Sequence, residues 1–456
     1  MIPEQFLNRM RSMPHLDFDA FCAALDTPAV RALRVNTIKT DTDTLLFVLP
    51  FDVTPVPFGQ NAFYAPEDKV GALPAHHAGM MYMQDPGAIS AVAAATPTPG
   101  MRVIDLCAAP GGKSTQLAAA ISPDGVLVCN EYVPSRCRIL QGNVERLGAK
   151  HAIVTNLDTA ALADFYGAYF DLVVADVPCS GEGMFRKYEV ASEEWSEENV
   201  LLCAARGFDI LENAAKLVAP GGKLLFSTCT FAPEENECNV DRFLGAHPDF
   251  ALVPVAPEIA KNTADGVTFD GLSHDMSLCR RFYPHLSPGE GQFVALLQRN
   301  DEGALATPRD AITAPDKKTA TLAYQFLDEV LTTRPDARLV QLRDDLYLAP
   351  HIPIPSKGVF APGVCIGTLT KGRIVPHHQL FSAYGKDFRR MLSLAHGDAR
   401  VMKYLRGEEI EAPELASKNG FAVLLYEGAP LGGGKIVGGM LKNHYPKGLR
   451  NRTSLT

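Results

Sequence analysis

The sequence predicts an α/β fold, a parallel sheet with helices on both faces, between an N-terminal extension and a C-terminal region of different texture. Short apolar runs alternate with amphipathic stretches through the middle of the chain. The first such run, "RVIDLC", is followed by the glycine-rich "AAPGGKS" and then by a helical stretch. Strand, turn and helix repeated in this order form parallel strands that are covered by helices.

The elements follow one another in a clear order. Residues 1–95 mix short helical signals with "ALRVNTIKT", whose β-branched residues predict a strand, and "TPTPG" then separates this extension from the alternating region. The predicted strands are "RVIDLC", "GVLVCNE", "AIVTN", "DLVVADV", "KLLFST" and "FVALLQ". The predicted helices are "KSTQLAAAI", "PSRCRILQGNVERLG", which has proline at its start and glycine at its end, and "LLCAARGFDILENAAKLV".

The C-terminal third differs from the middle of the chain. Residues 299–321 are polar, charged and proline-containing, which is typical of a linker. Beyond them, "GVFAPGVCIGTLTKGRIVP" and "GAPLGGGKIVGG" predict short strands joined by tight turns. We therefore expect an N-terminal extension over 1–95, a central domain over 96–299, a linker over 300–318, a first C-terminal domain over 319–375 and a second over 376–456.

Composition excludes several classes of protein. The 456 residues are 46% hydrophobic and 21% charged, as in a soluble globular protein, and the longest apolar runs are too short or too interrupted to span a bilayer. Asn8, Arg9 and Arg11 break the apolar core that a signal peptide would need. We expect a cytoplasmic protein with no membrane partner. Its ten cysteines contain no C-x-x-C pair, which argues against a metal site and for reduced thiols.

The charge is divided unevenly along the chain. Residues 1–316 hold 23 basic and 40 acidic residues, a balance of −17, whereas residues 317–456 hold 20 basic and 12 acidic, a balance of +8. After Glu427 the chain has no acidic residue, and its last basic residue is Arg452. This asymmetry predicts a basic C-terminal region that meets an anionic partner, or else a solvated basic face.

The stretch "DLCAAPGGKSTQ" ends like an ATP-binding phosphate loop. Such a loop needs a glycine five residues before its Gly-Lys, and that position is Cys107. Gly111 and Gly112 still let the backbone approach a ligand closely, and the helix that opens at Lys113 and Ser114 suits a carboxylate or a single phosphate. In open parallel sheets, the turn after the first strand is a ligand site.

Two acids accompany this turn. Glu131 ends the next strand, where a carboxylate accepts hydrogen bonds from ribose hydroxyls, and Asp158 follows the third strand, where an adenine amino group would lie. These features fit S-adenosylmethionine, which has an adenosine and a carboxylate but no pyrophosphate. A dinucleotide fits less well because G-x-G-x-x-G is absent, and the alternative is a structural turn without a ligand.

Two cysteines follow strands of the same sheet. "DLVVADVPCSGEG" places Cys179 just after Asp176, and "KLLFSTCTFAPEENE" places Cys229 in the matching position, before a helix expected from Pro233. Taken singly, each is more readily a packing residue. Beside a methyl donor, however, a thiolate that adds to C6 of cytosine makes C5 nucleophilic, and Asp176 could stabilise the adduct at N3 or N4 of the base. Pro233 would start a helix whose dipole favours the Cys229 thiolate, opposed by Glu234 and Glu235.

The segments "DLCAAPGGKS", "DVPCSGEG" and "STCTFAPEENE" resemble the signatures of RNA 5-methylcytosine methyltransferases of the Sun/Nop family. "LRVNT", "MQDPGA" and "RRFYPHLSPGEGQFVA" are similar to further family segments. The resemblance implies that Cys229 is the nucleophile, that Cys179 promotes release of the methylated base and that Asp176 assists. It places S-adenosylmethionine on Cys107, Ala108, Ala109, Pro110, Gly111, Gly112, Lys113, Glu131, Arg136, Asp158 and Asp176.

The closing "GAPLGGGKIVGGMLKNHYPKGLR" resembles the RsmF branch of this family. The branch implies a Rossmann-like methyltransferase sheet over 96–299, an RNA-binding N-terminal extension, and a C-terminal α+β region that ends in a PUA-like RNA-binding module. It further implies rRNA in or near the 30S subunit as partner, and we expect a monomer. Transfer RNA as substrate and a non-catalytic, RNA-binding assembly factor remain alternatives. Two residues depart from the family pattern, Val177 for alanine and Gly207 for glutamine.

Overall fold

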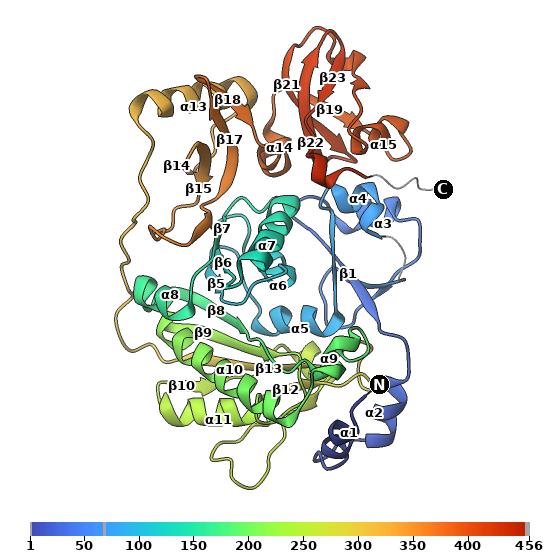
Figure 1. Cartoon of the computed structure of the whole chain (residues 1–456), viewed down its shortest axis with the longest axis vertical. Helices are drawn as coiled ribbons and strands as arrows, with labels where there is room; N and C mark the ends of the chain where they lie inside the picture. The colour runs from blue at the N-terminus through green and yellow to red at the C-terminus, as the bar shows by residue number, and fades with distance from the viewer. Residues whose placement is uncertain (1, 67–69, 452–456) are drawn as a thin grey trace.

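The computed structural model describes residues 2–66 and 70–451, so Arg452 lies outside the described residues. In Figure 1 the central sheet lies below two C-terminal units, and the first two helices lie at the opposite end, beside the lower part of the sheet. The N-terminal part forms a small sheet in the order β2-β3-β1-β4. Its elements are α1 (Glu4–Arg11), α2 (Phe18–Leu25), β1 (Arg31–Val35), α3 (Thr42–Val48), β2 (Thr54–Pro55), β3 (Ala62–Ala65), α4 (Pro74–His77) and β4 (Met81–Gln84), and α5 (Pro86–Ala95) then leads into the central sheet.

The predicted alternation of strands and helices forms the central α/β sheet. Five parallel strands lie in the order β9-β8-β5-β6-β7. Helices α5, α6 and α7 pack side by side, as do α8, α10 and α11, and the two groups cover opposite faces of the sheet (Figure 1). The elements are β5 (Arg102–Asp105), α6 (Gly112–Ile121), β6 (Val126–Asn130), α7 (Pro134–Leu147), β7 (Ala152–Thr155), α8 (Thr159–Tyr166), β8 (Phe170–Asp176), α9 (Glu189–Glu193), α10 (Glu197–Leu217), β9 (Val218–Thr228) and α11 (Glu237–Ala246).

The sheet is mixed, and in this the expectation of a parallel sheet was wrong at both edges. The predicted strand "FVALLQ" forms as β13 (Gln292–Arg299), but it runs antiparallel to β9. β13 is also antiparallel to β12 (Arg280–Phe282), because the loop that joins these two strands is too short for the crossover helix that parallel neighbours require. The remaining elements at this edge are β10 (Phe250–Leu252), α12 (Pro257–Lys261) and β11 (Ala264–Asp265).

The other edge of the sheet is completed from beyond the linker. β16 (Val359–Ala361) pairs antiparallel with β7, and Ile354 and Ala361 are buried in the central hydrophobic core. The segment expected as a separate domain over 319–375 therefore contributes one strand to the central sheet. Residues 300–316 contain no helix or strand, and Asp316 caps the helix that follows them.

Two small β units make up the rest of the C-terminal region. The first has the strand order β14-β15-β17-β18, and the second has the order β19-β21-β22-β23-β20. In β22, Gly433 is required because a Cβ atom there would lie 2.2 Å from the Phe381 ring. The elements are α13 (Lys317–Val330), β14 (Arg338–Leu342), β15 (Asp345–Ala349), β17 (Val364–Thr370), β18 (Arg373–Pro376), α14 (His378–Tyr384), β19 (Met391–Leu394), α15 (Ala399–Leu405), β20 (Ile410–Glu411), β21 (Gly420–Tyr426), β22 (Ala429–Val437) and β23 (Met440–Asn443).

The N-terminal sheet and the last β unit share one core. Leu33 and Met81 of the N-terminal part pack in the same cluster as Leu424 and Leu441. Buried Lys39 extends this contact, since its Nζ donates to Ser382 Oγ at 2.9 Å and to the Pro430 carbonyl at 3.1 Å. The two ends of the chain therefore form one side of the molecule together.

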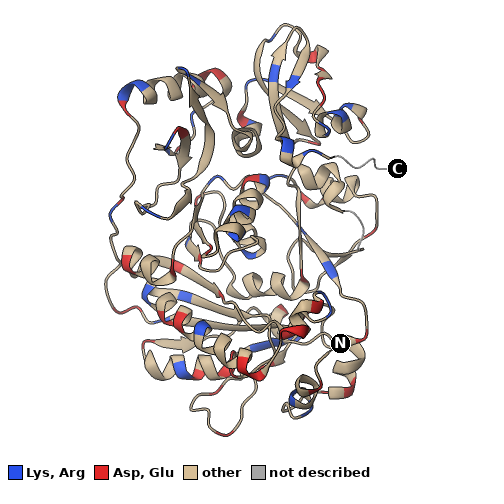
Figure 2. Cartoon of the chain, viewed as in Figure 1, with Lys and Arg blue, Asp and Glu red and all other residues tan. Residues whose placement is uncertain are grey.

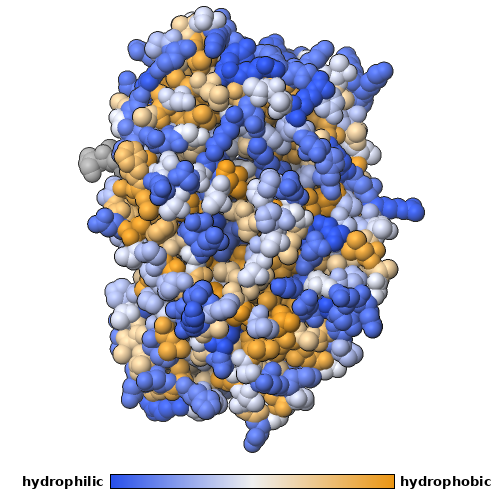
Figure 3. All heavy atoms as spheres, turned by 180° about the vertical axis from the view of Figure 1, so that it is seen from behind, coloured by the Kyte–Doolittle hydropathy of each residue, from blue (hydrophilic) through white to orange (hydrophobic). Residues whose placement is uncertain are grey.

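The surface shows no continuous apolar belt in the view from behind, where hydrophobic residues form separate patches between hydrophilic ones (Figure 3). Among residues 2–66 and 70–451, no helix combines the length and the apolar character needed to cross a bilayer. Basic residues of the C-terminal region are spread over several elements (Figure 2). Several of them already have acidic partners within that region: Arg334 pairs with Asp328, Arg400 with Asp398 and Glu414, Arg406 with Glu408, and Lys442 with Glu409.

Candidate active site

The glycine turn lies between β5 and α6 at the carboxyl edge of the sheet. Gly111 has φ +114°, in the left-handed region that favours glycine, and Gly112 begins the helix. Asp105, the last residue of β5, is buried and accepts a hydrogen bond from Ser114 Oγ at 2.6 Å. Burial raises the pKa of Asp105 to about 7. The hydrogen bond between Asp105 of β5 and Ser114 of α6 thus holds the two ends of the turn together.

A cavity of about 510 Å³ opens beside this turn. It is lined by Asp105, by Asp176 and by most of the turn, namely Cys107, Ala108, Ala109, Pro110, Gly112 and Lys113. Tyr82, Gln84 and Arg186 line it as well. The volume falls within the range of small-molecule and cofactor sites.

Glu131 and Arg136 stand next to the turn. One carboxylate oxygen of buried Glu131 accepts from the Val133 N–H at 2.8 Å, and the other lies 3.6 Å from the Arg136 guanidinium without a hydrogen-bond partner within the described part of the chain. Arg136 donates to the Ala109 carbonyl at 2.9 Å, so it ties the acid to the turn. A buried carboxylate oxygen with an open acceptor position suits a hydroxyl donor such as that of a ribose.

Asp158 has a simpler local role. Its side chain caps α8 and accepts from the Ala160 N–H at 2.8 Å. The residue is exposed and follows β7 at the carboxyl edge, as the sequence predicts. Neither Glu131 nor Asp158 is among the residues that line the 510 Å³ cavity.

Asp176 and Lys113 form an ion pair at the centre of the site. Lys113 Nζ donates to one Asp176 oxygen at 2.8 Å, and Ser227 Oγ donates to the other at 2.6 Å. Burial opposes the charge of Lys113, but the neighbouring Asp176 carboxylate outweighs it, so the pKa of Lys113 is raised. Gln292 Nε2 lies 3.4 Å from the same carboxylate. The arrangement holds Asp176 as a fixed acceptor facing the cavity.

The two predicted cysteines meet. Cys179 Sγ lies 3.3 Å from Cys229 Sγ, and the Cys229 backbone N–H donates to Cys179 Sγ at 3.3 Å. Both are free thiols, because a disulfide would place the sulfurs about 2 Å apart. The contact with Cys229 and burial raise the pKa of the Cys179 thiol well above its ordinary value. The Cys179 thiol is therefore protonated at neutral pH.

The helix expected from Pro233 starts later. Residues 233–236 form a turn, and α11 begins at Glu237. Asn236 holds this turn, because its Nδ2 donates to the Thr230 carbonyl at 3.0 Å and its Oδ1 accepts from Thr228 Oγ1 at 2.6 Å. Side-chain to backbone bonds of this kind compete with helix formation. The predicted effect of a helix start at Pro233 on Cys229 was therefore wrong.

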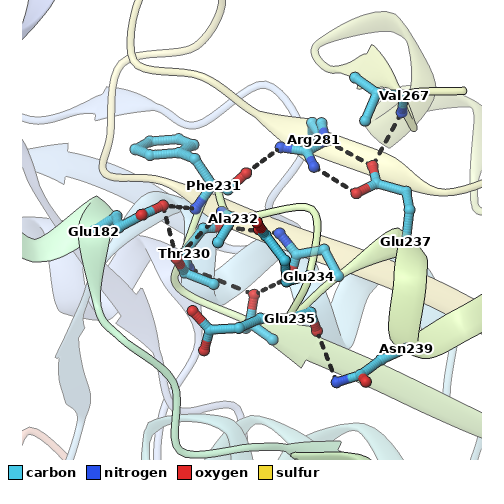
Figure 4. A network of polar contacts seen from close by, with 12 residues as sticks. Glu182, Thr230, Phe231, Ala232, Glu234, Glu235, Glu237, Asn239, Val267 and Arg281 are labelled. Carbon is cyan, nitrogen blue, oxygen red and sulfur yellow. Dashed lines mark hydrogen bonds and ion pairs between the residues drawn. The ribbon is translucent and has the colours of Figure 1, made fainter. Parts of the chain in front are cut away.

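A buried network of carboxyl groups lies under the two cysteine loops (Figure 4). Glu182 accepts from Trp195 Nε1 at 3.0 Å, from Thr230 Oγ1 at 2.9 Å and from the Phe231 N–H at 2.9 Å. Glu237 pairs with fully buried Arg281, whose guanidinium also donates to the Phe231 carbonyl at 2.8 Å. The chain after Cys229 is thus held from both sides.

Glu235 completes this network. The sequence pattern alone did not identify it as a functional residue. Its carboxyl group contacts Ser180, and burial raises the pKa of Glu235 to about 7. The signal in the sequence was a hydroxyl residue directly after each cysteine, Ser180 and Thr230. That signal acquires meaning only when the two loops are placed side by side.

The two departures from the family pattern lie against each other. A Cβ atom on Gly207, in the middle of α10, would stand 3.3 Å from Val177 Cγ2 and 3.5 Å from Asn239 Nδ2. Val177 is buried directly before the Cys179 loop. The Val177 side chain therefore occupies the space that the missing side chain leaves at Gly207.

The described residues do not suggest a metal centre. In the part of the chain that the structure describes, no three His, Cys, Asp or Glu side chains cluster as metal ligands would.

Comparison with known proteins gives the same assignment in three parts of the chain. Residues 92–298 match the family "16S rRNA methyltransferase RsmB/F", residues 2–86 match "N-terminal domain of 16S rRNA methyltransferase RsmF", and residues 392–451 match "Methyltransferase RsmF PUA domain". Among solved structures, a methyltransferase homologue from Pyrococcus horikoshii is similar with TM-score 0.57 and 26% identity, over 65% of this chain and 95% of that one. The sheet is thus a methyltransferase sheet.

Full-length relatives extend the similarity to the whole chain. Ribosomal RNA small subunit methyltransferase F of Klebsiella pneumoniae is 32% identical over 98% of this chain and 96% of its own length. The protein of the same name from Shewanella baltica is 30% identical over 95% of this chain and 93% of its own. The chain therefore belongs to the RsmB/F family of 16S rRNA methyltransferases, and is of the RsmF type with an N-terminal domain and a C-terminal PUA domain.

Proposed function

We propose that this rRNA methyltransferase transfers the methyl group of S-adenosylmethionine to C5 of a cytosine in 16S rRNA through a covalent adduct with Cys229. S-adenosylmethionine supplies the electrophilic methyl group on its sulfonium centre. The observation that carries the proposal is the pair of thiols 3.3 Å apart, in the loops that follow Asp176 and Ser227, since Asp176 lines the cavity at the glycine turn. A single packing cysteine would not require a partner in the matching position after a neighbouring strand.

The cofactor residues proposed are those of the turn and its acids. Gly111 and Gly112 admit the ligand next to the backbone, and the open oxygen of Glu131 accepts from a ribose hydroxyl. Arg136 orients Glu131 through its contact with Ala109, and Asp158 accepts from the adenine amino group while it caps α8. Cys107, Ala108, Pro110 and Lys113 complete the wall of the site.

The chemical steps use the three remaining side chains. The Cys229 thiolate adds to C6 of the cytosine, and the electron pair of the C5–C6 double bond shifts so that C5 attacks the methyl group. The bond between that methyl group and the sulfonium sulfur breaks, and S-adenosylhomocysteine leaves. Asp176, held by Lys113 and Ser227, accepts a hydrogen bond from the N4 amino group, or from N3 once that atom is protonated, and so holds the base in the adduct. Once its own proton has passed to water, the Cys179 thiolate removes the C5 proton, so that the C5–C6 double bond re-forms and the bond to Cys229 breaks.

The raised pKa of Cys179 fits this last step. A thiol that is protonated before the adduct forms does not compete as nucleophile, and a basic thiolate is a stronger proton acceptor.

The N-terminal domain (1–95) and the C-terminal modules (319–375 and the PUA-like 376–456) are proposed to bind rRNA around this site, in or near the 30S subunit. The target base must leave its stack to reach a pocket at the sheet edge. We further propose that the protein acts in the cytoplasm as a monomer. The same chemistry on transfer RNA is the second candidate substrate, since the site itself would accept either RNA.

The test is methyl transfer by the Cys229→Ala variant. Wild-type protein should bind S-adenosylmethionine and transfer label to 16S rRNA, naked or in 30S subunits, and bisulfite sequencing should locate the product at cytosine. Cys229→Ala should retain cofactor binding and lose transfer. Turnover by this variant at the wild-type rate would contradict the covalent route. Transfer to transfer RNA but not to rRNA would favour the second candidate, and cofactor-independent RNA binding without any transfer would favour an assembly factor.

A further inference from the structure

A hydroxyl residue follows each of the two cysteines, and these hydroxyls touch. Ser180 Oγ lies 2.8 Å from Thr230 Oγ1. Ser180 Oγ also lies 2.5 Å from Glu235 Oε1, and Thr230 Oγ1 lies 2.9 Å from Glu182 Oε2. Four oxygen atoms therefore form a chain of three close contacts, Glu235–Ser180–Thr230–Glu182, that bridges the two cysteine loops.

This chain needs one proton more than its hydroxyls supply. Two oxygen atoms at hydrogen-bond distance attract each other only when a hydrogen lies between them. Three contacts require three hydrogens, whereas Ser180 and Thr230 provide one each. With both carboxyl groups ionised, one contact in the chain would bring two lone pairs together in a buried site. The third hydrogen must come from a carboxylic acid at one end.

The donors around each carboxyl group decide which end is protonated. Glu182 is surrounded by donors, since the Trp195 Nε1–H and the Phe231 N–H point at its two oxygens in addition to Thr230. Burial raises the pKa of Glu182, but these three donors and the charge of Arg9 act in the opposite direction and favour the ionised form. Glu235 Oε2 accepts from the Ser180 N–H at 2.9 Å, but its Oε1 contacts only Ser180 Oγ among the hydrogen bonds of the described residues. Oε1 is therefore the atom that can carry the proton.

We propose that Glu235 is a neutral carboxylic acid in the active enzyme, and that its proton completes a relay that holds the Cys179 and Cys229 loops together. Glu235 donates to Ser180, Ser180 donates to Thr230, and Thr230 donates to ionised Glu182. Glu235 is thus a positioning residue and does not touch the substrate. Its role rests on the proposed function in one respect, namely that the spacing of the two cysteines matters for methyl transfer.

The surroundings of Glu235 agree with a neutral group. Its carboxyl group is desolvated, and the ionisable groups that face it are Glu182, Cys179 and Cys203 on α10, none of which is a cation. The nearby cations act on other groups: Arg9 pairs with Glu234 at 2.7 Å, and Arg281 pairs with Glu237. Arg206 acts on Cys203. Ionisation of Glu235 therefore removes a proton from the relay without a compensating charge.

A direct test measures the proton itself, without RNA or cofactor. Infrared difference spectra of the full chain at neutral pH should show a carboxylic C=O band that Glu235→Gln removes and that Glu182→Gln does not remove. Thermal unfolding of each variant checks that it is folded. If the band is absent from the wild type, or is lost only in Glu182→Gln, the assignment is overturned. This result does not depend on whether either cysteine is catalytic.

A second test uses the pH profile of methyl transfer. The side chain of Glu235→Gln can donate to Ser180 at any pH, so this variant should keep kcat near the wild-type value and lose the alkaline decline that ionisation of Glu235 causes. Glu235→Ala and Ser180→Ala break the relay and should lower kcat, by up to about 10²-fold if the loops move by about 1 Å, with KM for S-adenosylmethionine unchanged. The proposal would be overturned if kcat of the wild type and of Glu235→Gln declined in the same way at alkaline pH. Full activity of both alanine variants would overturn it as well. Inactivity of Glu235→Gln alongside a fully active Cys229→Ala would count against the proposed function instead.

Discussion

The sulfur atoms of Cys179 and Cys229 lie 3.3 Å apart although 50 residues separate them in the chain. Each cysteine follows a strand of the central sheet, β8 or β9, and these strands are parallel neighbours. The pairing of Asp176 with Ser227 across the two strands brings the two loops out at the same level. The proximity of the thiols is therefore a consequence of strand register, and the hydroxyl relay beneath them fixes it.

The roles of the two thiols can be separated by trapping. Without Cys179, methyl transfer should still occur, but removal of the C5 proton slows and the protein stays bonded to RNA through Cys229. Cys179→Ala should accumulate a protein–RNA species that survives denaturing electrophoresis, whereas the double variant Cys179→Ala/Cys229→Ala should not. Because Asp176 is close, cofactor affinity is measured in parallel. Trapping through Cys179 in a Cys229→Ala protein would reverse the roles.

Much of this site could be predicted from the sequence because its signals are local. Pro134 and Gly148 bound α7 as expected, and the residues at the ends of β5, β8 and β9 follow directly from the strand pattern. Other features depend on tertiary pairing. β16 has three residues and a register shift, so its place beside β7 has no periodic signal. Likewise, the Ser180–Glu235 contact joins residues that are 55 positions apart.

Val177 and Gly207 should behave as a coupled pair. Gly207→Ala gains about 1 kcal/mol of helix propensity in α10, but its Cβ atom would press on Val177 Cγ2 at 3.3 Å. In the wild-type background, we expect the two effects to offset each other in the free energy of unfolding. In a Val177→Ala background, the same substitution should stabilise, with a coupling of about 1 kcal/mol in a double-mutant cycle. Denaturant unfolding measures it, and additive effects would show that the two residues do not constrain each other.

Truncation before the C-terminal region should damage the central domain. Deletion from residue 319 removes β16 from the sheet edge and takes Ile354 and Ala361 out of the central core. It also exposes the side of the N-terminal sheet that packs against Leu424 and Leu441. We expect a lower unfolding temperature and faster limited proteolysis within residues 96–299. If the truncated protein keeps wild-type stability and loses only RNA affinity, these contacts contribute little and the C-terminal region acts as an independent RNA-binding unit.

Glu235 should make stability depend on pH in a definite direction. Its pKa in the folded protein is about 7, above that of an exposed glutamate, so between these values the folded state binds more protons than the unfolded state. The free energy of unfolding contributed by this group therefore falls as pH rises from about 4.5 to about 7 and stays low above it.

Glu235→Gln removes this contribution, so its unfolding temperature relative to wild type should rise between about pH 5 and about pH 8. The expected change is of the order of 2–3 kcal/mol, since each unit of pKa shift corresponds to about 1.4 kcal/mol. Glu234→Gln, which alters the half-buried neighbour that pairs with Arg9, is the matched control and should not show this trend. A difference between Glu235→Gln and wild type that is constant across the pH range would mean that Glu235 is ionised in the folded protein, and the relay would lack its third hydrogen.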